Sequence, residues 1–167
     1  MRAFIILIMA TLMSGCASMN AAMTPGVKVT NDPYDGSKTV TQKPVSASSS
    51  LSESWHTLGF VWTAKHPDTV VLIVGVNGID NISDVDFMVD GKELTSIDTA
   101  SSLTDYGDWS NRTFRIDLSE FKQLANADDV RMKVSRIDEY SVSTFGAANT
   151  GAIVNSKFPP FLEALAE

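Results

Sequence analysis

Cysteine and histidine are scarce in this 167-residue chain, which has one cysteine, Cys16, and two histidines, His56 and His66. A single thiol excludes an intramolecular disulfide framework and a multi-thiolate metal centre. A zinc site needs three or four ligands at compatible spacing, and the two histidines lie ten residues apart at an expected strand start and in a turn. We therefore expect two surface histidines, no metal site and no cofactor.

Basic residues are also fewer than acidic ones. Thirteen basic residues stand against twenty acidic ones, which gives a formal net charge of −7. Nucleic-acid binding needs a basic face that neutralises phosphates, so the composition argues against a nucleic-acid partner. For the same reason it argues against an electrostatic hold on anionic lipid headgroups.

No apolar run is long enough to span a bilayer, which requires about 20 residues. The longest candidate at the N-terminus, residues 4–13, follows Arg2 and precedes small residues, the three-part pattern of an export signal. The next residues read Met13-Ser14-Gly15-Cys16. This segment resembles the lipobox of bacterial lipoproteins, whose usual form is Leu, Ala or Ser, Gly or Ala, and Cys. Met13 departs from that pattern, although Leu12 lies beside it.

The resemblance implies that residues 1–15 are a signal peptide and that Cys16 is lipidated. In this class the thiol receives a diacylglyceryl group, cleavage occurs before the cysteine, and the new amine is acylated with a fatty acid such as palmitate. Several chains anchor a protein durably, whereas one chain binds only marginally. Ala17, rather than Asp, after the cysteine favours the outer membrane with the domain facing the periplasm. The alternative is an ordinary secretory leader in which Cys16 is incidental.

Cleavage before Cys16 removes Arg2, so the mature chain carries a net charge of −8 and has no cysteine left for a disulfide. Residues 16–26 are small, polar and proline-containing, which predicts a lipidated cysteine followed by a flexible tether. We expect residues 27–167 to form a single β-rich globular domain. Residues 44–54 are rich in serine and predict an exposed loop or a linker, which would separate an N-terminal hairpin from the main body.

Alternating apolar residues predict most of the strands, among them 83–89, 129–137 and a further strand over 140–144. The apolar run 69–76 predicts a central strand buried on both faces. Asp90-Gly91 predicts a hairpin turn. Ser119 is the expected N-cap of one short helix, and Pro159-Pro160 opens another. The expected fold class is therefore a β-rich α+β domain, with a single antiparallel sheet or a sandwich-like arrangement and one or two short covering helices.

Four carboxylates gather in one part of the sequence: Asp80, Asp84, Asp86 and Asp90. A calcium ion takes six to eight oxygen ligands, so such a cluster is chemically admissible. Its spacing matches no calcium loop, and we expect a solvated strand face whose negative charge deters pairing with another strand edge.

The sequence contains no nucleophile elbow of the G-x-S-x-G type and no glycine-rich phosphate loop. The favoured hypothesis is a non-catalytic binding or accessory lipoprotein that presents its domain to an envelope protein or a cell-wall partner. The alternative is an anchored periplasmic hydrolase or carbohydrate-active domain that uses carboxylates on the 80–90 and 105–109 segments.

Aromatic side chains in polar segments are the candidates for partner binding, because loops carry function and Trp and Tyr are enriched at interfaces. Tyr106 and Trp109 lie in a polar, irregular stretch, and Trp55 precedes a predicted strand. Trp62 alternates with Leu58 and Phe60, so we expect it in the core.

Overall fold

The computed structural model describes residues 24–166, so the predicted signal peptide, Cys16 and the tether up to residue 23 lie outside the described residues. Within residues 24–166, ten strands form two sheets in which every strand pair is antiparallel. In spatial order, the larger sheet contains β1 (Lys28–Asn31), β2 (Lys38–Ser46), β3 (His56–Thr63), β4 (Thr69–Asn77), β8 (Trp109–Asp117) and β7 (Asp98–Thr99). The smaller sheet contains β10 (Tyr140–Phe145), β9 (Val130–Ser135), β5 (Asp84–Val89) and β6 (Lys92–Glu93).

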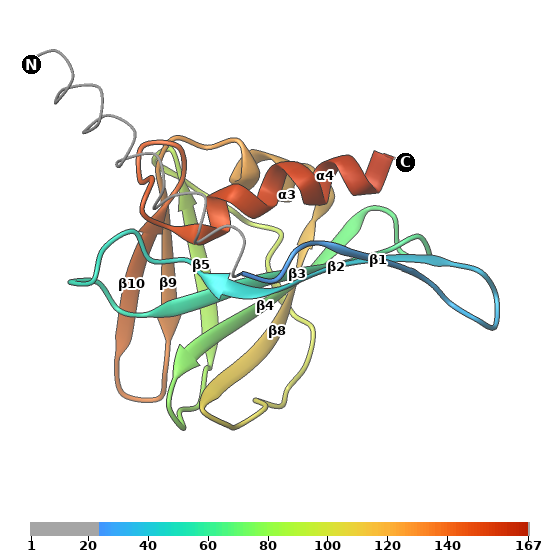
Figure 1. The fold of residues 1–167 in the computed structure, drawn as a ribbon. Coiled ribbons are helices and arrows are strands. Elements are labelled where there is room, and N and C mark those ends of the chain that lie inside the picture. The colour runs from blue at the N-terminus through green and yellow to red at the C-terminus, as the bar shows by residue number, and fades with distance from the viewer. Residues whose placement is uncertain (1–23, 167) are drawn as a thin grey trace, which may run out of the picture.

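In the described part of the chain, three short helical elements complete the fold: α3 (Leu118–Ala125), the 3₁₀ helix η1 (Ile153–Lys157) and α4 (Phe158–Ala166). Figure 1 shows α4, in red, lying across the top of the two sheets. The predicted fold class, a β-rich α+β domain with short covering helices, is confirmed.

The core lies between the two sheets, because alternate side chains of each strand point inward. Phe60 is its centre, with ring centroids of Phe121, Phe158 and Phe161 at 5.1, 4.9 and 5.3 Å. The first of these rings belongs to α3 and the other two to α4, so the helices are held to the sheets by an aromatic cluster. Such pairs each contribute about 0.5–1.5 kcal/mol beyond the area that they bury.

Strand β4 is central, between β3 and β8. Its side chains at Val70, Leu72, Val74 and Val76 are buried, whereas Val71 and Ile73 are only half-buried. The expectation that both faces are buried is therefore wrong. The core and the helices cover one face of the larger sheet, and β4 keeps its apolar character on the other face without a covering layer.

The serine-rich segment 44–54 begins inside β2, which ends at Ser46, and continues into a loop over residues 47–55. Ser46 pairs with Thr57 and Thr39 pairs with Thr63, with a bulge between Gln42 and Val45. The β1–β2 hairpin therefore belongs to the same sheet as β3 and β4.

Two local predictions, a hairpin turn and a helix N-cap, have different outcomes. Asp90 and Gly91 adopt φ values of 49° and 79°, the left-handed conformation that the predicted Asp-Gly hairpin turn requires. Helix α3, however, begins at Leu118 with Asp117 in the N-cap position, so the predicted N-cap Ser119 is wrong by two residues. Chain continuity explains the shift, since β8 ends at Asp117 and the helix follows directly.

Candidate functional site

A groove of about 550 Å³ lies where the end of β2 meets the starts of β3 and β8. The groove is lined by two of the three predicted partner-binding residues, Trp55 and Trp109. Sheet register explains this meeting across 54 positions of sequence: His56 pairs with Val76 on β4, and the next residue of β4, Asn77, pairs with Trp109. The other lining residues are Thr24, Pro25, Pro44, Val45, Ser46, Ser48, Ser49, Ser50, Leu51, His56, Thr57, Gly151 and Ile153.

The groove is electrically neutral, because no aspartate, glutamate, lysine or arginine is among its lining residues. His56 is the one titratable group in the lining. It is buried, with 2% of its surface exposed, so its expected surface position is wrong. Two serines of β10 hold the imidazole, with Ser143 Oγ 2.9 Å from Nδ1 and Ser141 Oγ 2.8 Å from Nε2.

The pKa of His56 is lowered to about 4, mainly because the imidazole is buried; the positive charge of Arg136 also lowers it, and the negative charge of Glu53 opposes the shift. The imidazole is therefore neutral at pH 7 and both of its nitrogens are engaged. This arrangement is structural, since it leaves neither nitrogen free to ligate a metal or to take a proton from a substrate. His66 lies exposed in the turn between β3 and β4.

Arg136 connects this buried histidine to the surface. Its Nη2 donates to Ser141 Oγ at 2.7 Å, and its Nη1 lies 2.9 Å from Asp80 Oδ2 and 3.1 Å from Glu139 Oε1. The guanidinium thus fixes the β9–β10 turn against the loop after β4, so the two loops keep a defined relative position.

Glu53 anchors the 47–55 loop to the other sheet. Its carboxylate accepts hydrogen bonds from the backbone N–H groups of Thr144 and Ser49, at 3.2 and 3.1 Å, and from the Thr144 hydroxyl. Partial burial raises the pKa of Glu53, but these hydrogen bonds from Thr144 and Ser49 together outweigh burial, so the pKa lies below its usual range. The carboxylate also occupies an outward N–H of β10, an edge strand, which protects that edge from pairing.

Tyr106, the third predicted residue, does not line the groove. It lies in one of three neighbouring loops, residues 78–83, 100–108 and 136–139, which we call the loop end. Thr104 donates to Asn81 at 3.1 Å, and the Gly78 N–H donates to the Asp108 carbonyl at 2.9 Å. Together with the Arg136 contacts, these bonds hold the three loops side by side.

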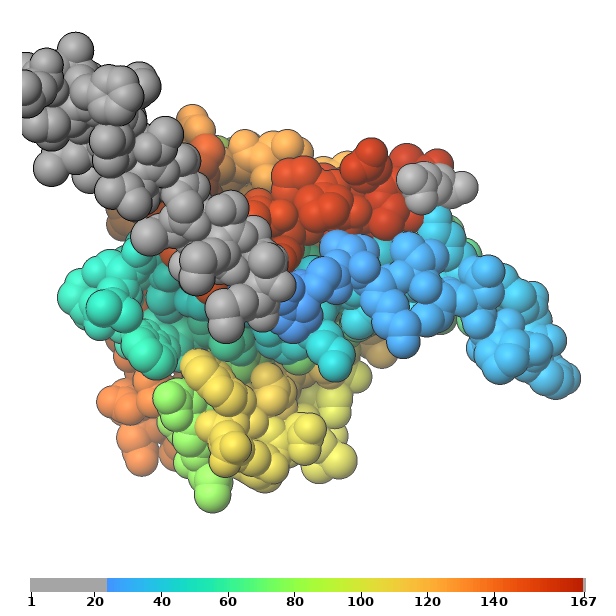
Figure 2. Space-filling view, in the orientation of Figure 1, coloured from blue at the N-terminus to red at the C-terminus, as the bar shows by residue number. Residues whose placement is uncertain are grey.

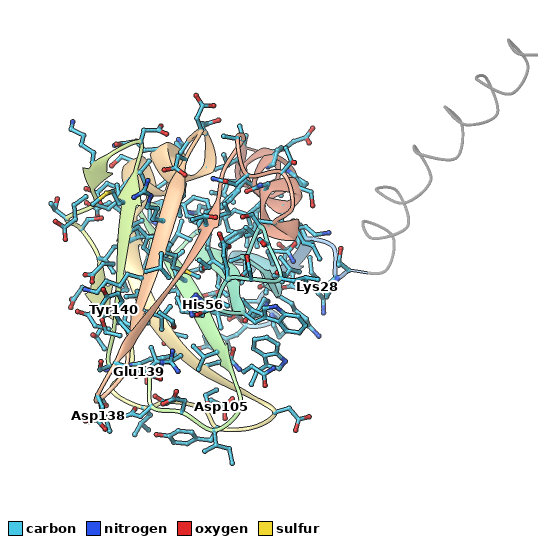
Figure 3. The ribbon with its side chains drawn as sticks, turned by 90° about the vertical axis from the view of Figure 1, so that its left-hand side faces the viewer. Lys28, His56, Asp105, Asp138, Glu139 and Tyr140 are labelled. Carbon is cyan, nitrogen blue, oxygen red and sulfur yellow. The ribbon has the colours of Figure 1, made fainter. Side chains whose placement is uncertain are left out.

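The loop end exposes large apolar side chains among acidic ones. The exposed apolar residues are Ile79 (83%), Leu103 (77%), Tyr106 (55%) and Ile137 (74%). The same loops carry five carboxylates and the guanidinium of Arg136, and Arg112 of β8 donates to backbone carbonyls of residues 82, 83 and 101 in two of them. Figure 3 shows Asp105, Asp138 and Glu139 together at the end of the molecule farthest from the helices.

The carboxylates predicted as an acidic cluster are individually partnered. Asp86 lies 2.8 Å from Lys133 Nζ, Asp80 pairs with Arg136, and Asp90 Oδ1 accepts the backbone N–H groups of residues 128 and 129. Asp84 accepts the N–H of the next residue. Among residues 24–166, no group of three or more His, Cys, Asp or Glu side chains is arranged to hold a metal ion.

No family model matches the chain, and neither a curated protein nor a solved structure matches it. Within the described part of the chain, no helix has the length and apolar character needed to cross a membrane.

Some of these features have no signal in the sequence. The β10 partners of Glu53 and His56 lie 91 and 85–87 positions away, and nothing local connects them. The one available hint is the pair Ser141 and Ser143, polar residues at alternate positions of a predicted strand, which indicates an inward face that needs hydrogen-bond partners.

Proposed function

We propose that this protein is a cell-envelope lipoprotein that is anchored through Cys16 and acts as a non-catalytic binding module for an envelope protein or a cell-wall partner. The lipobox resemblance and Ala17 favour the outer membrane, with the domain facing the periplasm. The observation that carries the binding role is the loop end, where four exposed apolar side chains lie among five carboxylates.

Exposed apolar side chains that gather at one place and are rimmed by polar groups are typical of protein interaction sites. The loops are tied to one another by side-chain bonds, so little ordering entropy would be lost on binding. Because potentials across an interface are complementary, the surplus of carboxylates favours a partner with basic side chains around its own apolar patch.

Three carboxylates of the domain have pKa values that do not suit a general acid. A general acid needs a carboxyl whose pKa is raised towards the working pH. In Glu53 and Glu120, partial burial is the largest single effect and raises the pKa, but several hydrogen bonds together outweigh it, so the pKa of each glutamate is lowered. In Asp35, the hydrogen bond from Lys65 is the largest effect and lowers the pKa. These carboxylates are therefore ionised and already partnered, as expected of structural groups.

Anchoring is tested by the variant Cys16→Ala. We expect the lipidated protein to sediment with the membranes and to incorporate a fatty-acid probe, and the variant to appear in the soluble fraction without label, because the acyl chains supply the membrane affinity. Unchanged membrane retention of the variant would refute the lipid anchor.

Binding at the loop end is tested by placing a photo-crosslinking amino acid at Leu103 in cells that carry the lipidated protein. We expect a discrete crosslinked species from Leu103, because this side chain is exposed among the loop-end residues. The matched control places the same amino acid at Glu163, which is exposed on α4 at the other end of the fold.

The charge reversal Asp105→Lys should weaken the crosslink from Leu103 without changing the abundance of the protein, because it removes part of the acidic rim. Crosslinking that is equal from Leu103 and Glu163, or absent from both, contradicts a binding role for the loop end.

A further inference from the structure

The rim of the groove presents apolar side chains that have no cover in the described part of the chain. Leu51 has 87% of its surface exposed and Trp55 has 52%. Both belong to the 47–55 loop, which Figure 2 shows in turquoise at the margin of the molecule. The loop is held in shape by Ser48 Oγ, which donates to the Ser54 carbonyl at 2.6 Å, and by the bonds of Glu53. The exposed pair is therefore a fixed feature of the surface.

This rim lies beside the start of the described chain. Thr24 and Pro25 line the same groove as Leu51 and Trp55, and Gln42 Nε2 donates to the Pro25 carbonyl at 3.1 Å. If Cys16 carries the lipid, as proposed above, the seven residues 17–23 connect it to Thr24. At a maximum of about 3.6 Å per step from one residue to the next, the eight steps from Cys16 to Thr24 reach at most about 29 Å. Thr24, and the groove that it lines together with Leu51 and Trp55, therefore stay close to the lipid surface.

The chemistry of the rim fits the boundary between lipid and water. Tryptophan is enriched at membrane interfaces because its ring is apolar and its N–H is polar, and leucine partitions into the acyl region. None of the lining residues carries a carboxylate that headgroups would repel, His56 is neutral at pH 7, and the Glu53 carboxylate is turned onto β10. The loop end, in contrast, carries five carboxylates, which anionic headgroups would repel.

We propose that the Leu51–Trp55 rim lies in the interface of the phospholipid bilayer that holds the lipid anchor, so that the domain rests on the membrane in one orientation. The inference depends on the proposed anchor at Cys16. Tethering makes a weak contact effective, because the second binding event is intramolecular once the acyl chains are inserted. The rim then acts as the second membrane contact, and the loop end stays in the aqueous space where a partner can reach it.

The test uses two matched variants of the lipidated full chain, Leu51→Cys and Leu103→Cys. Cys16 is the only cysteine of the sequence, and its thiol is blocked by the lipid, so each variant has one free thiol for an environment-sensitive fluorophore. Both replaced leucines are exposed, so neither substitution removes a core contact. The labelled proteins are reconstituted into phosphatidylcholine vesicles with or without brominated acyl chains, which quench only fluorophores within the bilayer.

We expect the fluorophore at position 51 to shift to the blue and to lose emission in brominated vesicles, and the fluorophore at position 103 to do neither. Flotation of the vesicles reports the anchor separately. Flotation without quenching at position 51 overturns the membrane contact and leaves the anchor intact. A protein that does not float contradicts both the anchor and the inference.

Equal quenching at positions 51 and 103 shows adsorption without orientation and also overturns the inference. If the fluorophore at position 51 is not quenched in vesicles, but a crosslinker at the same position captures a protein in cells, the rim binds a protein partner and the membrane contact is overturned.

A second measurement uses the emission of Trp55 itself, isolated by Trp62→Phe and Trp109→Phe. The reference is Trp62 isolated by Trp55→Phe and Trp109→Phe, because Trp62 lies at the opposite end of β3. Quenching of Trp55 and not of Trp62 agrees with the proposal, and the reverse contradicts it.

Discussion

Two serine hydroxyls of β10 fix the imidazole of His56, and the histidine is neutral because burial and the Arg136 charge lower its pKa to about 4. In the unfolded chain the same group titrates near 6.5. Between these values the unfolded state binds a proton that the folded state does not, so stability falls as the pH drops from about 6.5 to about 4. The full difference is on the order of 3 kcal/mol.

We therefore predict that the free energy of unfolding, measured in urea, is about 2 kcal/mol lower at pH 5 than at pH 7.5. The variant His56→Gln should be less stable than the wild type at pH 7.5 and should show little of this pH dependence. The control His66→Gln should keep it, because that side chain lies exposed in a turn. A wild-type protein that is equally stable at both pH values would contradict the assignment of His56 as a neutral buried group. Glu53 and Glu120, whose pKa values are lowered from 4.5, lose their contribution only at still lower pH and do not obscure the comparison.

At the scale of elements, sequence periodicity predicted much of what the structure has. Alternating apolar residues predicted strands at 83–89 and 129–137, which correspond to β5 and β9, and the Asp90-Gly91 turn follows from the left-handed preference of those residues. These elements were predictable because their signals are local: a period of two with one buried face, and a turn that needs positive φ.

The elements that periodicity missed depend on contacts between distant residues. The bulge of β2 at Pro44 lies against Gly59 of β3, where a Cβ atom would stand 2.7 Å from the Pro44 nitrogen. Neither residue signals the other in the sequence. In the same way, Trp55 and Trp109 were predicted as separate binding residues, and only sheet register brings them into one groove while leaving Tyr106 at the loop end.

At the scale of the whole molecule, the two sheets depend on one core. Phe87 of β5 contacts Phe145 of β10, with ring centroids 6.4 Å apart, and Phe145 stacks on Phe158, which stacks in turn on Phe60 of β3. The aromatic chain therefore runs from the smaller sheet through α4 to the larger one. Because neither sheet buries its inner face without the other, we expect the two to unfold as one cooperative unit.

Amide hydrogen exchange, measured across a series of low urea concentrations, tests this cooperativity. We predict that the amides of β4 and β9 exchange with the same free energy, equal to that of global unfolding, because both strands are paired on either side and contribute to the shared core. The amides of β1 should exchange with a much lower free energy, since that strand lies at a sheet edge and all four of its residues are exposed. The 47–55 loop should lie between these limits, because Glu53 bonds it to β10 while Leu51 and Trp55 remain in solvent in the absence of a membrane. If β9 exchanged with a free energy well below that of β4, the smaller sheet would open independently, and the aromatic chain through Phe145 and Phe158 would not couple the two sheets.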